Sequence, residues 1–133
     1  MRRHILTVLG YIVATFFTQA TSHFVIFAQH YAALTYLRAE TIFPLGFATM
    51  IIQGGVLSYV FANSRFAGGS RMDAVRFAWL FGAFGVSYAA LGEAAKYNVP
   101  SIPSWIAVEV GVGFVQYTLF GILLGLAHGV KKL

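Results

Sequence analysis

The chain has 133 residues, of which 59% are hydrophobic and 10% are charged, and its formal net charge is +5. Soluble domains carry about 25% charged residues, and a soluble fold of this composition would expose larger apolar patches than soluble monomers tolerate. The same figures exclude a disordered chain, which would be poor in apolar residues and rich in charge. Together with a mean hydropathy of +0.75, they indicate an all-α membrane protein.

Four stretches without Asp, Glu, Lys or Arg mark the candidate membrane spans: 4–37, 41–64, 77–92 and 110–130. A membrane-crossing helix needs about 20 apolar residues, so four spans with their loops nearly fill the chain. We expect transmembrane helices at about 5–27, 43–62, 73–96 and 104–128. They would form one antiparallel four-helix domain of residues 1–133, with the segment after the first span lying at the membrane interface.

Turn and capping residues agree with these bounds. Pro44 suits the first turn of a helix, where its missing N–H has no partner to lose. Ser70 and Asp73 have the spacing of a capping box. Pro100 and Pro103 are expected to prevent a helix from continuing, so Ser104 is the expected cap of the last span.

The N-terminus also resembles a secretory signal peptide. Arg2 and Arg3 precede an apolar stretch, and Thr18-Gln19-Ala20 has the small residues of a cleavage site. We favour an uncleaved first span over this alternative.

The distribution of Lys and Arg predicts the orientation. Seven basic residues would lie on one side of the membrane, against two (Arg38 and Lys96) on the other. Basic residues are concentrated in cytoplasmic loops, so both termini are expected in the cytoplasm of a bacterial cell, with the chain as a multi-pass protein of the inner membrane. The seven are Arg2, Arg3, Arg65, Arg71, Arg76, Lys131 and Lys132.

The pI of about 9.8 is then explained by this topology and by anionic lipid headgroups. No nucleic-acid partner is expected, because no soluble face remains to carry a basic groove. The chain has no cysteine, which excludes disulfides, thiol catalysis and thiolate metal sites.

Ionisable side chains at membrane depth are costly, and each is therefore a functional candidate. His23, Glu93 and Glu109 come from three different spans and are expected at one depth, in the outer leaflet. Facing inward, they and their helical neighbours would form an outward-opening polar pocket. The candidates for ligand or proton binding are Gln19, His23, His30, Glu93, Lys96, Glu109 and Gln116.

Three interpretations of this cluster remain open. In a structural one, Glu93 pairs with Lys96, and Glu109 hydrogen-bonds His23 or solvent. In a second, Glu109 or Glu93 changes protonation when a cation or proton arrives. In a third, His23, Glu93 and Glu109 bind zinc, copper or iron, although His23 and His30 are about 10 Å apart along a straight helix.

Two further histidines, His4 and His128, are expected at the cytoplasmic ends of the first and last spans. Histidines on facing helices could ligate haem, but a solvated histidine is ordinary at such a position. The sequence leaves the identity of any cofactor unknown.

Glycines offer close packing faces in the spans, because helices approach each other in lipid through small residues. Such faces serve contacts within the bundle, or contacts with a second copy or another membrane chain. The expected partners are thus the lipid bilayer and other membrane chains or the protein itself. The candidate packing residues are Gly54, Gly85, Gly121, Gly125 and Gly129.

The two halves of the chain share a weak internal sequence similarity. The segment from Ser22 to Tyr31 ends the first span much as the segment from Ser87 to Tyr97 ends the third. A duplication of this kind would relate two hairpins by an axis along the membrane normal. The spacing differs by one residue, which favours coincidence.

In general shape, four spans in so short a chain resemble the small multidrug transporters, the fluoride channels and the membrane glutathione transferases. Ala107-Val-Glu109-Val resembles the helical glutamate segment of the small multidrug transporters. In that family the glutamate lies deep in the first helix, whereas Glu109 is shallow in the last.

The sequence contains no complete catalytic constellation, which argues against an enzyme. It predicts a non-enzymatic accessory subunit or binding module with an outer-leaflet polar pocket. The alternative is a proton-coupled transporter of small molecules or cations that works as a homodimer through Glu109 and Glu93. A metal- or haem-binding membrane protein is the third interpretation.

Overall fold

The computed structural model describes residues 1–129, and every regular element in this range is helical. Four stretches are long and apolar enough to cross a membrane, namely Arg2–Ile26, Phe43–Ala62, Arg71–Gly92 and Ile102–His128. The expectation of four apolar helices is therefore confirmed. Lys131 and Lys132, which the orientation argument uses, lie outside the described residues.

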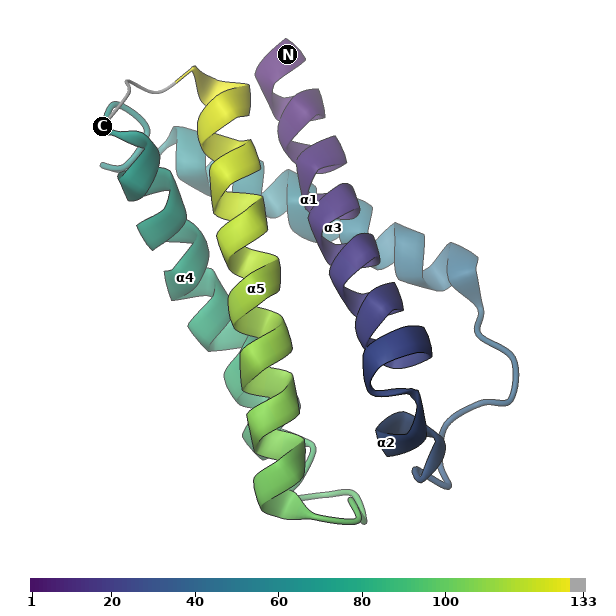
Figure 1. Ribbon diagram of the computed structural model, residues 1–133. Helices are drawn as coiled ribbons and strands as arrows, with labels where there is room; N and C mark the ends of the chain where they lie inside the picture. The colour runs from purple at the N-terminus through teal and green to yellow at the C-terminus, as the bar shows by residue number, and fades with distance from the viewer. Residues whose placement is uncertain (130–133) are drawn as a thin grey trace.

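The elements follow one another in a simple order. Two of the long helices are extended at their C-terminal ends by a π-helical turn, and the short α2 follows the first of these turns (Figure 1). The bounds are α1 Arg2–Thr21, η1 Ser22–Ile26, α2 Ala28–Ala32, α3 Phe43–Ala62, α4 Arg71–Ser87, η2 Tyr88–Gly92 and α5 Ile102–His128.

Helix α5 is the centre of the arrangement. It packs against α1 on one side and α4 on the other, while α3 packs on α1 and crosses behind the other helices at a steep angle (Figure 1). The start of α1 and the end of α5 lie at the same end of the molecule, where the rings of His4 and His128 are 6.0 Å apart. We call this the terminal end, and the opposite one the loop end.

The core lies toward the terminal end and takes residues from all four long helices. Phe61 of α3 meets Phe77 of α4 with ring centroids 5.1 Å apart, and Tyr11 of α1 meets Phe120 of α5 at 5.0 Å. By contrast, large apolar side chains on the outward faces of the same helices are exposed, as for Phe84 at 80%. An apolar exterior of this kind is the surface that lipid covers.

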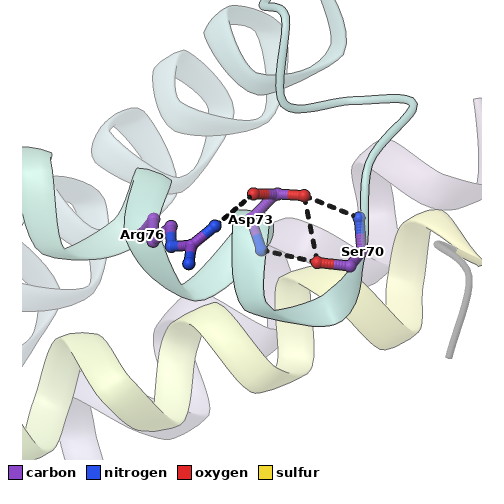
Figure 2. Close-up of polar contacts among 3 residues, drawn as sticks. All are labelled: Ser70, Asp73 and Arg76. Atoms are coloured by element: carbon purple, nitrogen blue, oxygen red, sulfur yellow. Dashed lines mark hydrogen bonds and ion pairs between the residues drawn. The ribbon is translucent and has the colours of Figure 1, made fainter. Parts of the chain in front are cut away.

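Helix α4 begins with the expected capping box. The Ser70 hydroxyl accepts a hydrogen bond from the Asp73 backbone N–H at 3.3 Å, and the Asp73 carboxylate accepts one from the Ser70 N–H at 2.9 Å (Figure 2). Arg76 donates to the other oxygen of Asp73 at 3.0 Å. Two backbone groups that a helix start leaves unpaired are thereby satisfied.

The expectation that Ser104 caps the last helix is wrong. Ser101 is the cap, and its hydroxyl accepts from the Ser104 N–H at 3.4 Å. Pro103 does not delay the helix, because it lies in the first turn, where a missing N–H costs nothing. At its other end α5 stops at Gly129, whose φ of 62° places it in the left-handed region that favours glycine.

The expected bounds of the first and third helices also need correction. Both helices loosen into a π turn toward the loop end, in which the N–H of Phe27 bonds to the Ser22 carbonyl and that of Glu93 to the Tyr88 carbonyl, each at 2.9 Å. The first span thus ends at Ile26 before the separate α2, and the third ends at Gly92 rather than at residue 96. The two turns fall within the two echoing segments of the sequence.

Three of the candidate packing glycines, Gly54, Gly85 and Gly121, lie at close contacts within the chain. A Cβ on Gly121 would lie 2.6 Å from the Cα of Val75 in α4, and one on Gly54 would lie 3.2 Å from the Cα of Val8 in α1. Gly85 lies against the hydroxyl of Tyr117, Gly125 is buried in α5, and Gly129 ends that helix.

Candidate functional site

A polar cavity of about 230 Å³ lies between α1, α3, α4 and α5. It contrasts with the core toward the terminal end, whose buried cluster is hydrophobic. Each of the four helices contributes to its walls, and α4 contributes through the stretch around Gly85 and Ala89. Its polar lining consists of Tyr11, Thr15, Gln19, Gln53, Glu109, Gln116 and Tyr117.

Two glutamines join α1 to α5 at the cavity. Gln19 donates a hydrogen bond from Nε2 to Oε1 of Gln116 at 2.7 Å, and Gln116 donates from its own Nε2 to the Thr15 hydroxyl at 3.1 Å. Gln116 is buried, with 5% of its surface exposed. The pair was predicted among the binding candidates, and the structure brings both members together in the same network.

A third amide, that of Gln53, ties α3 to this network. The Tyr11 hydroxyl donates to Gln53 Oε1 at 2.7 Å. Tyr11 is buried, whereas Gln53 is exposed. The cavity therefore reaches the surface of the molecule beside α3.

Glu109 is held from the loop end by Tyr31 of α2. The Tyr31 hydroxyl donates to Glu109 Oε1 at 2.7 Å and lies 3.5 Å from the Ser22 hydroxyl. The ring of His23 stacks on that of Tyr31, with centroids 3.6 Å apart and planes 13° apart. His23 therefore supports the tyrosine that holds Glu109, and its own Nδ1 bonds to the Gln19 carbonyl oxygen at 3.0 Å.

The remaining candidates lie outside this network. Lys96 donates to the Tyr88 hydroxyl at 3.0 Å and lies over the Tyr88 ring, on the exposed side of α4. His30 stacks on Trp105, with ring centroids 5.7 Å apart. Trp105 in turn donates from its indole N–H to the Ala89 carbonyl in η2 at 2.9 Å, which joins α5 to the π turn of the neighbouring helix.

Glu93 is half-buried just beyond η2. Burial raises its pKa above the ordinary glutamate value, the charge of Glu109 raises it further, and Lys96 lowers it in part. Burial and the hydrogen bond to Glu109 likewise raise the pKa of Tyr31, so this phenol keeps its proton and acts as a donor.

Neither carboxylate forms an ion pair with the residues described. Over residues 1–129 the ion pair that forms is Arg76 with Asp73, at the opposite end of the molecule. Two contacts that the structural interpretation names, Glu93 with Lys96 and Glu109 with His23, are not formed here: Lys96 bonds to Tyr88 and Glu109 to Tyr31. The structural role itself stays a hypothesis.

The metal interpretation gains no support from the geometry of the described chain, where no three His, Asp or Glu side chains come close enough to hold one ion. His4 bonds to the Ser58 hydroxyl at 2.8 Å through Nδ1, and the ring of His128 packs edge-on against Phe61. These two histidines thus pack against the helices and each other at the terminal end.

Two further hollows lie beside the cavity, toward the loop end. A hollow of about 850 Å³ under the loop before α3 shares His23, Phe24 and Thr41 with a second one of about 320 Å³. The second hollow shares Thr15, Gln19 and Gln53 with the polar cavity. His23 and Gln19 thus lie between neighbouring hollows.

Sequence reasoning missed Tyr11, Thr15 and Tyr31 as members of the site. The signal for the first two was present, because Tyr11, Thr15 and Gln19 follow one another at four-residue spacing and so share one face of α1. Tyr31 was expected in the segment after the first span, at the membrane interface, and only the turn of the chain after η1 brings it back to Glu109.

No protein-family model, no curated protein and no solved structure matches this chain. A function can therefore be inferred only from the geometry of the residues of this chain.

Proposed function

We propose that the chain is a multi-pass protein of a bacterial inner membrane, folded as an antiparallel four-helix bundle with both termini in the cytoplasm. The exposed apolar faces of its long helices support a membrane location. Arg2 and Arg3 lie at the start of α1, at the terminal end. The end of α3 lies there too, because the rings of Phe61 and His128 are 4.8 Å apart, and Arg65, Arg71 and Arg76 follow in the loop after α3 and the first turns of α4. This clustering supports a cytoplasmic terminal end.

The orientation can be measured with single cysteines, because the chain contains none of its own. Asn98→Cys in the loop end should react with a membrane-impermeant maleimide in intact cells. Gly68→Cys in the terminal end should react only after the cells are opened. The reverse pattern would contradict the proposed topology.

Within that membrane, the protein acts as a non-enzymatic binding module. The observation that carries this proposal is the cavity of about 230 Å³, which places polar side chains from α1, α3 and α5 inside an otherwise apolar bundle. Ligand sites typically combine a concave space with a few convergent polar groups. The amides of Gln19, Gln53 and Gln116 supply hydrogen-bond donors and acceptors, which favour binding over bond-breaking chemistry.

The test is a search for a small molecule that remains in the cavity. The protein is purified in nanodiscs and analysed by native mass spectrometry. Thr15→Phe fills the cavity, and Val13→Phe adds a similar ring on the exposed face of the same helix. A small-molecule adduct should be present on the wild type and on Val13→Phe and absent from Thr15→Phe. Equal adducts on all three proteins would contradict the proposal.

A second candidate function is proton-coupled transport of a small molecule or cation by a homodimer. The two hollows that lie between the loop end and the cavity of Glu109 support it, since a transporter needs access to its carboxylate. In proteoliposomes, Glu109→Gln should abolish uptake driven by a proton gradient while the protein still assembles. Uptake that is unchanged in this variant would exclude the mechanism. An accessory subunit, in contrast, should co-purify with another membrane chain in fixed stoichiometry.

A further inference from the structure

The lining of the cavity is acidic. Glu109 is the one carboxylate among its lining residues in the described part of the chain, and none of those residues is Lys, Arg or His. Charges inside a membrane are almost always paired or neutralised. The hydrogen bond from Tyr31 stabilises the carboxylate but adds no positive charge.

The surroundings of Glu109 add to the same acidic character. Glu93 is close enough that the charge of Glu109 raises its pKa. The nearest basic side chain on that segment, Lys96, is bonded to Tyr88 on the exposed side of η2. Glu93 and Glu109 thus lie near each other toward the loop end of the bundle, and neither is in ion-pair contact with a cation of residues 1–129.

The walls of the cavity have the other features that suit a cation. Tyr11 and Tyr117 both line it, with ring centroids 6.5 Å apart and planes 58° apart. Aromatic faces attract organic cations through the negative potential above the ring. The glutamine side chains beside them present amide oxygens, of which Gln53 Oε1 accepts from Tyr11 and Gln116 Oε1 from Gln19.

We propose that the ligand of this cavity is a small monovalent organic cation of the ammonium type, with Glu109 as its counter-charge and Tyr11 and Tyr117 as its aromatic walls. The inference rests on the proposed binding function and specifies its ligand class. The volume of about 230 Å³ lies below the roughly 300–1,000 Å³ of pockets for drug-sized molecules. A divalent metal fits less well, because Glu109 has no second and third ligand of the His, Asp or Glu type around it in the described chain.

The experiment compares two probes of the same shape and different charge. Choline carries a quaternary ammonium group, and 3,3-dimethylbutan-1-ol replaces its nitrogen by carbon. Binding of each is measured by calorimetry on the full chain in nanodiscs, for the wild type, Glu109→Gln and Glu40→Gln. Glu40 is the matched control, since it is an exposed carboxylate on the loop before α3.

The wild type should bind choline at least about tenfold more tightly than the neutral alcohol, which corresponds to a modest cation–π and ion-pair contribution. Glu109→Gln should remove that preference, and Glu40→Gln should keep it. Equal affinity of the wild type for the two probes would overturn the cation assignment while leaving a binding cavity. Binding of neither probe would overturn the assignment as well, and loss of the adduct difference between Thr15→Phe and Val13→Phe would separately overturn the binding function. The comparison of probes on the wild type stands even if Glu109→Gln fails to fold.

Discussion

The hydroxyl of Tyr31 donates a 2.7 Å hydrogen bond to Oε1 of Glu109, and this contact joins the short helix α2 to the long helix α5. Tyr31 is buried, with 4% of its surface exposed. The same ring carries the stacked imidazole of His23. One side chain thus links the π turn of the first span, the following segment and the carboxylate of the cavity.

Replacing Tyr31 by Phe should destabilise the protein by about 1.5–3 kcal/mol, the range for hydrogen bonds to charged groups. The ring and its stacking on His23 remain, so the loss reports the hydroxyl. Thermal unfolding in detergent measures the change. Tyr36→Phe is the control, because Tyr36 is exposed and stacks on Tyr97. Equal melting temperatures for Tyr31→Phe and the wild type would show that the bond contributes nothing to stability.

Two glycines of α5 should respond in opposite ways to the same substitution. Gly121→Ala places a methyl group 2.6 Å from the backbone of Val75, so α4 and α5 must move apart, at a cost of about 1–3 kcal/mol. Gly111 has nothing within 4 Å of such a methyl group. Gly111→Ala should be neutral or stabilise the helix by up to about 1 kcal/mol. Chemical denaturation of both variants tests the difference, and similar losses in both would argue against the α4–α5 packing.

Ser70→Ala removes one half of the capping box of α4. A lost N-cap of this type typically costs about 1 kcal/mol. Ser87→Ala, at the other end of the same helix, should have little effect, because that exposed hydroxyl bonds only back to the Phe84 carbonyl. Hydrogen exchange of the amides near Asp73 should rise in Ser70→Ala and stay unchanged in Ser87→Ala.

The cavity should be reachable from water at the loop end. In a Thr15→Cys variant, a hydrophilic methanethiosulfonate should modify the thiol through the hollows beside His23. Val13→Cys lies on the exposed apolar face of α1, which lipid would cover, and should react far more slowly. Modification is counted by mass spectrometry. A Thr15→Cys thiol as inert as the Val13→Cys thiol would mean that the cavity is closed to water.

Stability should depend on the protonation of Glu93. Its folded-state pKa lies above the ordinary 4.5 because of burial and the charge of Glu109, with Lys96 opposing in part. The folded protein therefore binds this proton more tightly than the unfolded chain does. The stabilisation by this proton is complete at pH values below the ordinary pKa of glutamate. It is lost as the pH rises through the raised pKa of Glu93 in the folded protein.

Melting temperatures recorded between about pH 4 and pH 8 should thus fall with rising pH more steeply in the wild type than in Glu93→Gln. Glu40→Gln, on the exposed loop before α3, should retain the wild-type slope. The pKa of Tyr36 is also raised, by burial and by Glu93. Tyr36 therefore keeps its proton throughout this pH range and does not contribute to the change in melting temperature.

The number of spans was predictable because it depends on composition and on the distances between charges. Capping was predictable at Ser70, where side-chain spacing alone decides the outcome. The choice between Ser101 and Ser104 as the cap of α5 was not predictable. Pro103 between them is compatible with a position just before the helix or within its first turn. Gln19 and Gln116 were predicted as binding candidates because they are helical neighbours of His23 and Glu109, whereas their contact at 2.7 Å comes from the structure.

The contacts of the Lys96 and Glu93 side chains were not predictable from their spacing in the sequence. Residues three apart on a continuous helix share a face, but the π turn before Glu93 ends that helix, and Lys96 turns to Tyr88 instead. The contact of Tyr31 with Glu109 was likewise not predictable from helical periodicity, because the position of Tyr31 depends on the direction of the chain after η1. Helical periodicity in the sequence therefore predicts which residues share a face of a regular helix, and it fails where the backbone becomes irregular.

The two π turns have a genetic consequence. A π turn holds one residue more than an α-helix needs for the same hydrogen-bonded path. Removing one residue from 88–92 would therefore restore regular winding while the residues that follow keep their direction, and Glu93 would stay near Glu109. In a regular stretch of helix the same deletion would rotate all that follows by about 100°. These two places are therefore where a single-codon deletion in a span should be tolerated best.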